Sequence, residues 1–586
     1  MSTFYVGLSN TLHDSALAIL SPEGEVLYAE ATERYLQNKR SIGCAPDYFQ
    51  HARKMIDKYC GAKADIVVAQ SWSPDAEKTM AKMLEQVHAE ERGLKAFFGE
   101  VPDFMRTHIS SREYLGQAQT NMLRQIGTTL KYELNQREGV PYLSELPIRG
   151  YDHHLTHAAT ACYSSPFDEA VCAVLDALGE GRSTGCFRYR DGRVMLADDP
   201  SNSTAGSLGF FYTFVCVVCG FGHLTGEEWK VMGLAAYGRP HPEAQELFRS
   251  MITVDGLDIR MASSGSLIPT LRRLHELRRT ANQPPAAAAD LALAGQQVFS
   301  EIYFTFLRNL HELGLSDNLV LGGGCTLNSS ANGRVLAETG FTKLHVYSAP
   351  GDDGNALGAA WLAFAEDHPE ISLTRARVQS PYLGSTLSDS TMEKVEQFGP
   401  SRRTTCVPDE VVRRTAQFLA DGKLVGWAQG RAEFGPRALG NRSILADARD
   451  PEVKDKINSR VKFREAFRPF APSILHEFGE EYFENYQETP YMERTLVVRE
   501  GVRDRVPGIV HEDGTARLQS VRRDLNERYY ELIEEFHRLT GVPLVLNTSF
   551  NVMGKPIIHT VEDALAVFYT SGLDVLVIGD TIFEKE

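Results

Sequence analysis

A chain of 586 residues is longer than one ordinary domain, and its 43% apolar and 24% charged side chains are typical of a globular protein, so we expect two or three domains. The 61 basic and 77 acidic side chains give a formal net charge of −16, which argues against a general binder of nucleic acid or of anionic membranes. The start, MSTFYVGLSN, has no signal-peptide pattern, and nine cysteines are too few for a disulfide framework, so we expect a cytoplasmic location.

The first half of the chain contains two similar strand–loop–hairpin units. The first thirty residues predict a strand and a hairpin that turns at SPEGE, and residues 169–197 predict a strand, a short loop and a hairpin that turns at RDG. Charge-mixed helical stretches lie between them, at 45–60 and 75–137. The repetition predicts an internally duplicated α/β fold.

Further along, apolar segments alternate with glycine-rich turns. The apolar run at 208–221 is shorter than a bilayer span and predicts a core helix. Residues 318–336 and 345–364 each predict a buried strand, a turn and the start of a helix. Together with the two hairpin units, these segments indicate a first domain over 1–365.

Apolar periodicity is lost after this domain, and we interpret 366–400 as a linker region. A second domain, 401–586, is then predicted from three apolar strand patterns at 423–430, 543–550 and 574–580.

The stretch YDHHLTHAAT, residues 151–160, places His153 and His157 four positions apart. On a helix such residues share a face, with Cβ atoms about 5–6 Å apart, which suits two imidazoles that hold one ion. The alternative is a pair of surface histidines at a helix start. Asp176 ends an apolar strand and Asp352 lies in the turn PGDDG, where carboxylates commonly face a ligand. Two imidazoles with two carboxylates favour Fe²⁺, Zn²⁺ or Mn²⁺ over calcium or magnesium, so we predict a metal site.

A nucleotide site is indicated more weakly. No GxxxxGK[ST] motif is present, which excludes a P-loop, whereas GGGCTLN at 322–328 is a glycine turn after a strand. Its alternative explanation is close strand–helix packing. Beside two further loops, SNTLHDSA at 9–16 and DALGEGRS at 176–183, this turn is where we expect an adenosine to bind.

The second domain concentrates positive charge in an otherwise acidic protein. Its arginines and lysine stand beside glycine, proline, phenylalanine and serine rather than acidic residues, in the segments GRAEFGPRALGNRS (430–443), KFREAFRPFAPS (462–473) and DGTARLQSVRR (513–523). Surface salt bridges are the alternative explanation. Because arginine forks bind phosphate oxygens in bidentate fashion, we favour a pocket for a polyphosphate or acyl phosphate.

Taken together, these segments resemble the O-carbamoyltransferase family of antibiotic biosynthesis, which includes enzymes of the nebramycin 5′ synthase, cephem and nodulation carbamoyltransferase types. The resemblance covers nearly the whole chain and is carried, in order, by HDSA, HHLTHAA, LDALGEG, KVMGLAAYG, GGGCTLN, PGDDGNALGAA, GRAEFGPRALGNRSILAD, KFREAFRPFAPSIL, DGTARLQSV and LNTSFN. It implies an actin/Hsp70-type, Kae1-like duplicated first domain and an α+β, YrdC-like second domain.

The resemblance also implies chemistry at two sites. The second domain would form carbamoyl adenylate from carbamoyl phosphate and ATP, with Mg²⁺ accompanying ATP, and the first would transfer the carbamoyl group with the help of a divalent metal, most often Fe²⁺. The implied metal ligands are His153, His157, Asp176 and Asp352. The implied adenylate contacts are Asp176, Gly179, Gly324 and Asn328. The implied phosphate-binding residues are Arg437, Lys462, Arg468, Arg517 and Ser549. Of these, Arg437, Lys462 and Arg468 would also be catalytic.

A base is needed to remove the acceptor's proton, and we expect His13, or Asp14 beside it, to serve. Both lie on the loop TLHDSA, which a duplicated fold brings across the cleft from the metal. The alternative for His13 is a hydrogen-bonded loop histidine.

The expected partner is a small molecule with an acceptor hydroxyl or amine, and we expect neither nucleic acid nor a membrane. A tRNA threonylcarbamoyl-type enzyme is the rival within enzymes, but the acidic balance speaks against it. A HypF-type enzyme would need an acylphosphatase domain and paired CxxC motifs, which we do not find in this sequence. A non-catalytic, ATP-regulated scaffold would need neither polar site.

Overall fold

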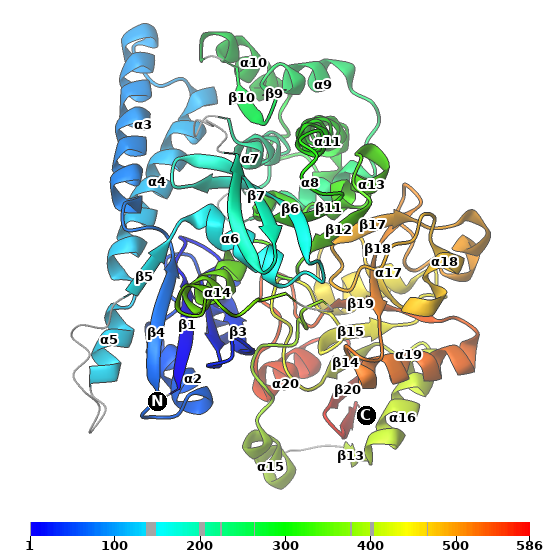
Figure 1. Ribbon diagram of the computed structural model, residues 1–586. Helices are drawn as coiled ribbons and strands as arrows, with labels where there is room; N and C mark the ends of the chain where they lie inside the picture. The colour runs from blue at the N-terminus through cyan, green and yellow to red at the C-terminus, as the bar shows by residue number, and fades with distance from the viewer. Residues whose placement is uncertain are drawn as a thin grey trace. The chain divides into compact units, whose positions relative to one another are not determined.

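The chain forms two units in a computed structural model (Figure 1). Unit 1 consists of Met1–Thr32, Arg40–Leu327 and Val335–Gln379, and unit 2 consists of Glu33–Lys39, Asn328–Arg334 and Ser380–Glu586. The structure describes residues 2–135, 148–198, 206–222, 226–262, 264–374, 378–398, 403–465 and 467–585.

Two short segments of the predicted first domain therefore belong to unit 2, so the expected uninterrupted range 1–365 differs from the structure. Arg34, in the first segment, donates a hydrogen bond from its guanidinium to the Gly435 carbonyl at 2.7 Å. Gly333, in the second, lies so close to the main chain that a Cβ there would be 1.9 Å from the Thr495 oxygen. Contacts between residues so far apart in the sequence leave no local pattern, so the sequence did not predict that these two segments belong to unit 2.

The remaining boundary between the units falls after Gln379, inside the predicted linker 366–400. Positions 375–377 and 399–400 of this linker lie outside the described residues. The rest contains a helix, α15 (Asp389–Phe398), which the loss of apolar periodicity did not predict.

Unit 1 contains two five-stranded sheets with the same order and the same strand directions. In each, an antiparallel three-stranded meander is followed by two parallel strands, so the orders are β3-β2-β1-β4-β5 and β8-β7-β6-β11-β12. The strands are β1 (Thr3–Ser9), β2 (Ala16–Leu20), β3 (Val26–Ala31), β4 (Asp65–Ser71), β5 (Ile148–Tyr151), β6 (Glu169–Gly179), β7 (Arg182–Arg190), β8 (Arg193–Asp198), β11 (Asn318–Gly322) and β12 (Lys343–Val346). The two hairpins predicted at SPEGE and RDG are β2–β3 and β7–β8, and the strand order repeats as the sequence units do.

Helices surround these sheets, with a small β9–β10 hairpin (Ile252–Asp255, Asp258–Met261) beside them. The helices are α2 (His51–Tyr59), α3 (Ala76–Phe98), α4 (Asp103–Gln125), α5 (Thr128–Asn135), α6 (His153–Tyr163), α7 (Leu208–Val218), α8 (Glu228–Ala235), α9 (Pro242–Arg249), α10 (Ser264–Leu277), α11 (Ala289–His311), α13 (Val335–Glu338) and α14 (Asn355–Asp367). The predicted core helix at 208–221 is α7, with most of its apolar side chains buried. In the described part of the chain, no helix is long and apolar enough to cross a membrane.

Helices α6 and α14 cross at very short range, and glycines make this close approach possible. A Cβ on Gly358 of α14 would lie 2.0 Å from the Thr156 carbonyl of α6. Likewise, a Cβ on Gly7 of β1 would lie 1.8 Å from the Ala356 carbonyl. These glycines are required because any side chain would push α14 away from the first sheet and from α6.

Unit 2 is built on one mixed nine-stranded sheet in the order β13-β21-β20-β14-β15-β19-β16-β18-β17. The strands are β13 (Arg403–Thr405), β14 (Val425–Ala428), β15 (Arg442–Ala446), β16 (Ala471–Leu475), β17 (Arg494–Val497), β18 (Thr515–Val521), β19 (Leu544–Ser549), β20 (Val575–Ile578) and β21 (Thr581–Glu584). The helices, apart from α15, are α1 (Thr32–Leu36, whose first residue belongs to unit 1), α12 (Ser329–Asn332), α16 (Pro408–Ala420), α17 (Val453–Ile457), α18 (Gly479–Tyr482), α19 (Glu527–Thr540) and α20 (Val561–Thr570), with a π-helical turn at Asn458–Lys462.

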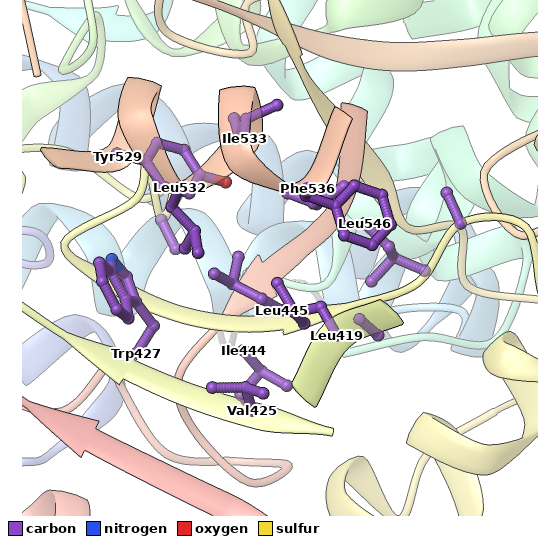
Figure 2. Close-up of a cluster of buried hydrophobic side chains, with 14 of the residues drawn as sticks. Leu419, Val425, Trp427, Ile444, Leu445, Tyr529, Leu532, Ile533, Phe536 and Leu546 are labelled. Atoms are coloured by element: carbon purple, nitrogen blue, oxygen red, sulfur yellow. The ribbon is translucent and has the colours of Figure 1, made fainter. Parts of the chain in front are cut away.

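The core of unit 2 lies between this sheet and its helices. Figure 2 shows Trp427 of β14 with Leu445 of β15 and Leu532 of α19 among the buried apolar side chains. Trp427 is fully buried, and burial of so large a side chain contributes strongly to stability.

Replacing Trp427 with alanine is expected to lower the free energy of unfolding of unit 2 by about 3–5 kcal/mol, because it removes buried area and leaves a cavity. Urea denaturation followed by circular dichroism measures the change. Val407→Ala is the control, since Val407 is 65% exposed and its loss should cost less than about 0.5 kcal/mol. Equal denaturation midpoints for the two variants would contradict the assignment of Trp427 to the core.

Candidate functional site

Two histidines face one point from the first two turns of α6. The helix begins after Asp152, whose carboxylate accepts a hydrogen bond from the Leu155 amide at 3.0 Å. His153 and His157 follow on one face of the helix, and both are at least 98% buried. The Trp72 ring packs against the His153 ring at 4.4 Å between centroids, which fixes that imidazole in place.

Two carboxylates complete the group from other elements. Asp176 comes from β6, and Asp352 comes from the turn that leads into α14. His153 Nε2 lies 3.3 Å from Asp176 Oδ2 and 3.5 Å from Asp352 Oδ1, and His157 Nε2 lies 3.3 Å from Asp352 Oδ1. One ligand atom from each of the four residues lies within 4.8 Å of all the others. The structure thus brings together the four predicted metal ligands.

The electrostatics of this group fit a cation. Burial alone would lower the pKa of His153, but Asp176 and Asp352 raise it to about 10. Burial likewise opposes ionisation of Asp352, yet the imidazoles hold its pKa well below the usual value. His157 Nε2 is buried and, although Asp352 Oδ1 lies 3.3 Å away, it makes no well-aligned hydrogen bond among the described residues. The negative charge of the two carboxylates stabilises positive charge at this place, and His157 Nε2 is available as a ligand atom. Such a site suits a divalent ion.

His13 and Asp14, the predicted bases, lie beside this group. His13 Nδ1 is 3.0 Å from Asp14 Oδ2 and 3.6 Å from Asp352 Oδ2. Asp14 adopts a left-handed backbone conformation, with φ of 58°, and accepts hydrogen bonds from Arg40 at 2.8 and 3.1 Å. Although burial opposes it, Arg40 and His13 lower the pKa of Asp14. A carboxylate paired this firmly is a poor base, so the geometry favours His13.

Two further residues at this place were not predicted. Arg40 anchors Asp14, and Glu228, at the start of α8, accepts a hydrogen bond from the Thr213 hydroxyl at 3.3 Å. Burial raises the pKa of Glu228, while the charges of Arg40 and His13 oppose that rise. The sequence signal was present in GEEWKVMG, where two consecutive acidic residues stand at the start of a mostly apolar helix.

The predicted adenylate contacts are distributed between the units. Gly179 of β6 must be glycine, because a Cβ would lie 2.5 Å from the His153 ring. Gly324 follows β11, and its amide donates to Asp176 Oδ1 at 3.1 Å, so these two predicted residues meet within unit 1. Asn328 belongs to unit 2, where its side-chain oxygen caps α12 by accepting from the Ala331 amide at 3.1 Å. This cap gives Asn328 a structural function.

In unit 2, Lys462 ends a π-helical turn and is 98% buried. Its Nζ donates to the side-chain oxygens of Ser549 and Asn551 at 3.2 and 2.6 Å, and also to their main-chain carbonyls. Burial, together with Arg464 and Arg468, lowers the pKa of Lys462 well below its usual value. The predicted residues Lys462 and Ser549 are therefore in direct contact. Asn551 is a further contact of Lys462 that was not predicted.

Four arginines share this environment, in which Glu465 is an acidic neighbour of Arg464. Burial lowers the pKa of Arg517, and the guanidinium groups of Arg437, Arg464 and Arg468 lower it further. Within the described ranges, Arg437 and Arg517 have no carboxylate partner, and Arg517 Nε is buried with no hydrogen-bond partner. Like charges held together at a cost in repulsion indicate a site that an anion completes. We call Arg437, Lys462, Arg464, Arg468 and Arg517 the cationic cluster.

Hydrogen bonds to its main chain hold the loop that carries Arg437. One oxygen of the buried Glu433 accepts hydrogen bonds from the amides of Leu439, Asn441 and Arg442 at 2.7–3.0 Å. Gln519 donates to the Leu439 carbonyl at 2.9 Å. The main chain beside Arg437 is thus held in place, and the described residues offer its guanidinium no carboxylate partner.

Comparison with known proteins gives matches over both units. A family model described as the carbamoyltransferase N-terminus matches residues 5–361, and one described as the carbamoyltransferase C-terminus matches residues 416–585. The nodulation protein NolNO of Sinorhizobium fredii is 40% identical over 74% of this chain and 63% of that protein, so the chain spans less than two thirds of its length.

Other relatives are covered more completely. The nodulation protein NolO of Bradyrhizobium diazoefficiens is 36% identical over 74% of this chain and 79% of that protein. An uncharacterised protein of a Synechocystis strain is 32% identical over 100% of this chain and 97% of that protein. A solved structure of full-length HypF in a phosphate- and nucleotide-bound form aligns with a TM-score of only 0.36 at 11% identity, covering 63% of this chain and 56% of that one, which is too low to support a conclusion.

Proposed function

The chain belongs to the carbamoyltransferase family, and from this premise we propose that it is an ATP-dependent enzyme that carbamoylates a small molecule in two steps. In the first step, carbamoyl phosphate, ATP and one water give carbamoyl adenylate, phosphate and pyrophosphate. In the second, a hydroxyl or amine of the acceptor attacks the carbamoyl carbon, AMP leaves, and the acceptor loses a proton.

One observation carries the proposal: the same chain holds a carboxylate–imidazole group in unit 1 and a cationic cluster in unit 2. Phosphoryl transfer needs cations that neutralise the oxygens of the transferring group, which arginine and lysine supply. Acyl transfer needs polarisation of a carbonyl and a base. Each site is suited to one of these steps.

For the first step, we assign phosphate binding to Arg437, Lys462, Arg468 and Arg517. Arg437 remains charged at neutral pH, because burial lowers its pKa only to about 10. Ser549 and Asn551 orient the Lys462 ammonium. We expect Mg²⁺ to accompany ATP.

For the second step, His153, His157, Asp176 and Asp352 would hold a divalent ion, Fe²⁺ before Zn²⁺ or Mn²⁺. When bound, the ion supplies Lewis-acid polarisation of the carbamoyl oxygen. His13 takes the acceptor proton, with Asp14 orienting its ring through Nδ1. Gly179 and Gly324 leave room for the adenylate beside Asp176.

The proposal extends to fold and location. The repeated order of the two sheets in unit 1 supports a duplicated, Kae1-like domain of the actin/Hsp70 type, and the mixed sheet of unit 2 supports a YrdC-like domain. Nine cysteines, all with free thiols, support a cytoplasmic location, where disulfides are rare.

Pyrophosphate release tests the proposal directly. With carbamoyl phosphate and ATP but no acceptor, the protein should release pyrophosphate faster than with either substrate alone. A coupled enzymatic assay for pyrophosphate measures this rate. Absence of release, with the folded protein verified by circular dichroism, would refute the adenylating step and favour the non-catalytic scaffold.

A further inference from the structure

The turn between β6 and β7 contains a strained residue that the mechanism above does not use. Glu180 has a left-handed backbone conformation, with φ of 48°, and is followed by Gly181, for which a φ of 85° has no steric cost. A glutamate in this region is uncommon, and such residues persist where surrounding contacts hold them. The contacts of the Glu180 side chain show what holds it there.

The Glu180 carboxylate joins two separate elements of unit 1. Its Oε1 accepts hydrogen bonds from the main-chain amide of Ser73 at 2.7 Å and from that of His153 at 3.1 Å. Its Oε2 accepts a hydrogen bond from the Ser73 hydroxyl. Ser73 follows β4, and His153 is the first residue of α6. One side chain therefore ties the end of a strand to the start of the helix that carries both predicted histidine ligands.

The second ring nitrogen of His153 makes no hydrogen bond that would orient the imidazole. Nε2 faces Asp176 and Asp352, whereas Nδ1 is buried and has no hydrogen-bond partner in the described part of the chain. In most metal sites the other ring nitrogen of a histidine ligand donates to a carboxylate, a carbonyl or water, which sets the orientation of the ring. Packing must set it here.

Two residues pack on the His153 ring. The Trp72 ring lies 4.4 Å away between centroids, and the Gly179 main chain is so close that a Cβ there would be 2.5 Å from His153 Cδ2. Trp72 directly precedes Ser73, and Gly179 directly precedes Glu180. The hydrogen bonds between Glu180 and Ser73 thus fix these two packing residues relative to each other. The bond to the His153 amide fixes the backbone from which the imidazole projects.

We propose that Glu180 is a positioning residue that holds the His153 imidazole in the orientation needed for the divalent ion and thereby increases the affinity of unit 1 for the metal. Its oxygens are bonded to main-chain amides and to the Ser73 hydroxyl, so it acts through His153 and not as a ligand. A ligand that is already oriented loses less freedom on binding, which strengthens the complex. The inference rests on the proposed function, because it takes the carboxylate–imidazole group to be a metal site.

Three substitutions of Glu180 change these contacts to different degrees. Glu180→Ala removes all three hydrogen bonds. Glu180→Gln keeps a side-chain oxygen that can accept from both amides. Glu180→Asp keeps the charge, but its side chain is one methylene too short to keep both amide bonds.

Asp47→Ala is the matched control for a merely structural loss. Asp47 is a buried carboxylate of unit 1, and its Oδ2 accepts hydrogen bonds from the Thr129 and Leu130 amides at the start of α5, at 3.0 Å each. Its removal therefore also takes two bonds to main-chain amides from unit 1. It alters no residue of the metal group.

Co²⁺ is the probe, added to the full chain after a chelator has removed other metals. The visible absorption of the bound ion gives the dissociation constant, and the shape of the spectrum reports the ligand geometry. We expect Glu180→Ala to raise the dissociation constant by about 10–100-fold and to alter the spectrum. Glu180→Gln and Asp47→Ala should keep the wild-type constant and spectrum. Should Glu180→Ala fold poorly by circular dichroism, Glu180→Asp takes its place, with a smaller increase expected in the same direction.

An unchanged dissociation constant and spectrum in the folded Glu180→Ala or Glu180→Asp variant overturns the inference. Equal weakening by Asp47→Ala also overturns it, since this would reflect a general loss of stability, as does equal weakening by Glu180→Gln, which would reflect charge and not orientation. A wild-type protein that binds no Co²⁺ instead refutes the metal site of the proposed function, and the inference with it.

Discussion

Replacing His157 with alanine is expected to slow carbamoyl transfer by more than about a hundredfold while pyrophosphate release continues. The side chain is one of four groups whose ligand atoms converge within 4.8 Å. Loss of an outer partner of a metal ligand commonly costs 10–100-fold, and loss of a ligand costs more. Two measurements are needed: the metal content of the purified protein, and the carbamoylated product formed from an acceptor found by mass-detected screening.

His345→Ala is the matched control for this variant. His345 is also a buried imidazole of unit 1, but it bonds the Ser164 hydroxyl at 3.0 Å and is not part of the carboxylate–imidazole group. It should keep both metal and transfer activity. If His157→Ala retained a full equivalent of metal and normal transfer, the ligand assignment would be wrong.

Replacing Arg437 with alanine should have the converse effect. Loss of one preorganised charge that faces the transferring group typically costs 10²–10³ in kcat, so pyrophosphate release should fall by about a hundredfold or more. Metal content should be unchanged, because no residue of the metal group is altered. Arg437→Lys keeps the charge but loses the bidentate fork and should recover only part of the rate.

Arg538→Ala controls for the loss of an arginine from unit 2. The Arg538 side chain is 65% exposed and pairs with Glu535 at 2.7 Å on the surface of α19, so its removal should leave pyrophosphate release unchanged. Equal loss of pyrophosphate release in His157→Ala and Arg437→Ala would end the division of the reaction between two sites.

The sequence predicted those features that depend on local periodicity. The spacing of His153 and His157 follows from the helix repeat, and the place of Asp352 follows from a glycine turn. Asp176 was expected to end its strand, but β6 continues to Gly179, and its pairing with β7 is irregular after Leu175. Both hairpins and the apolar helix α7 were likewise local patterns.

What the sequence did not reveal depends on partners far away in the chain. Asp14 was predicted as an alternative base to His13, and the sequence did not show that Arg40, 26 residues later, pairs with its carboxylate. Asn328, predicted as an adenylate contact, caps α12, which begins at the next residue, through the Ala331 amide.

The exchange of short segments between the units has a consequence for anyone who dissects this protein. A fragment made of residues 380–586 alone would lack Arg34, which donates to the Gly435 carbonyl two residues from Arg437. It would also lack the stretch whose Gly333 packs against Thr495. A truncation at residue 380 would therefore remove two segments of unit 2 itself. Loss of activity in such a fragment would not show which unit performs which step.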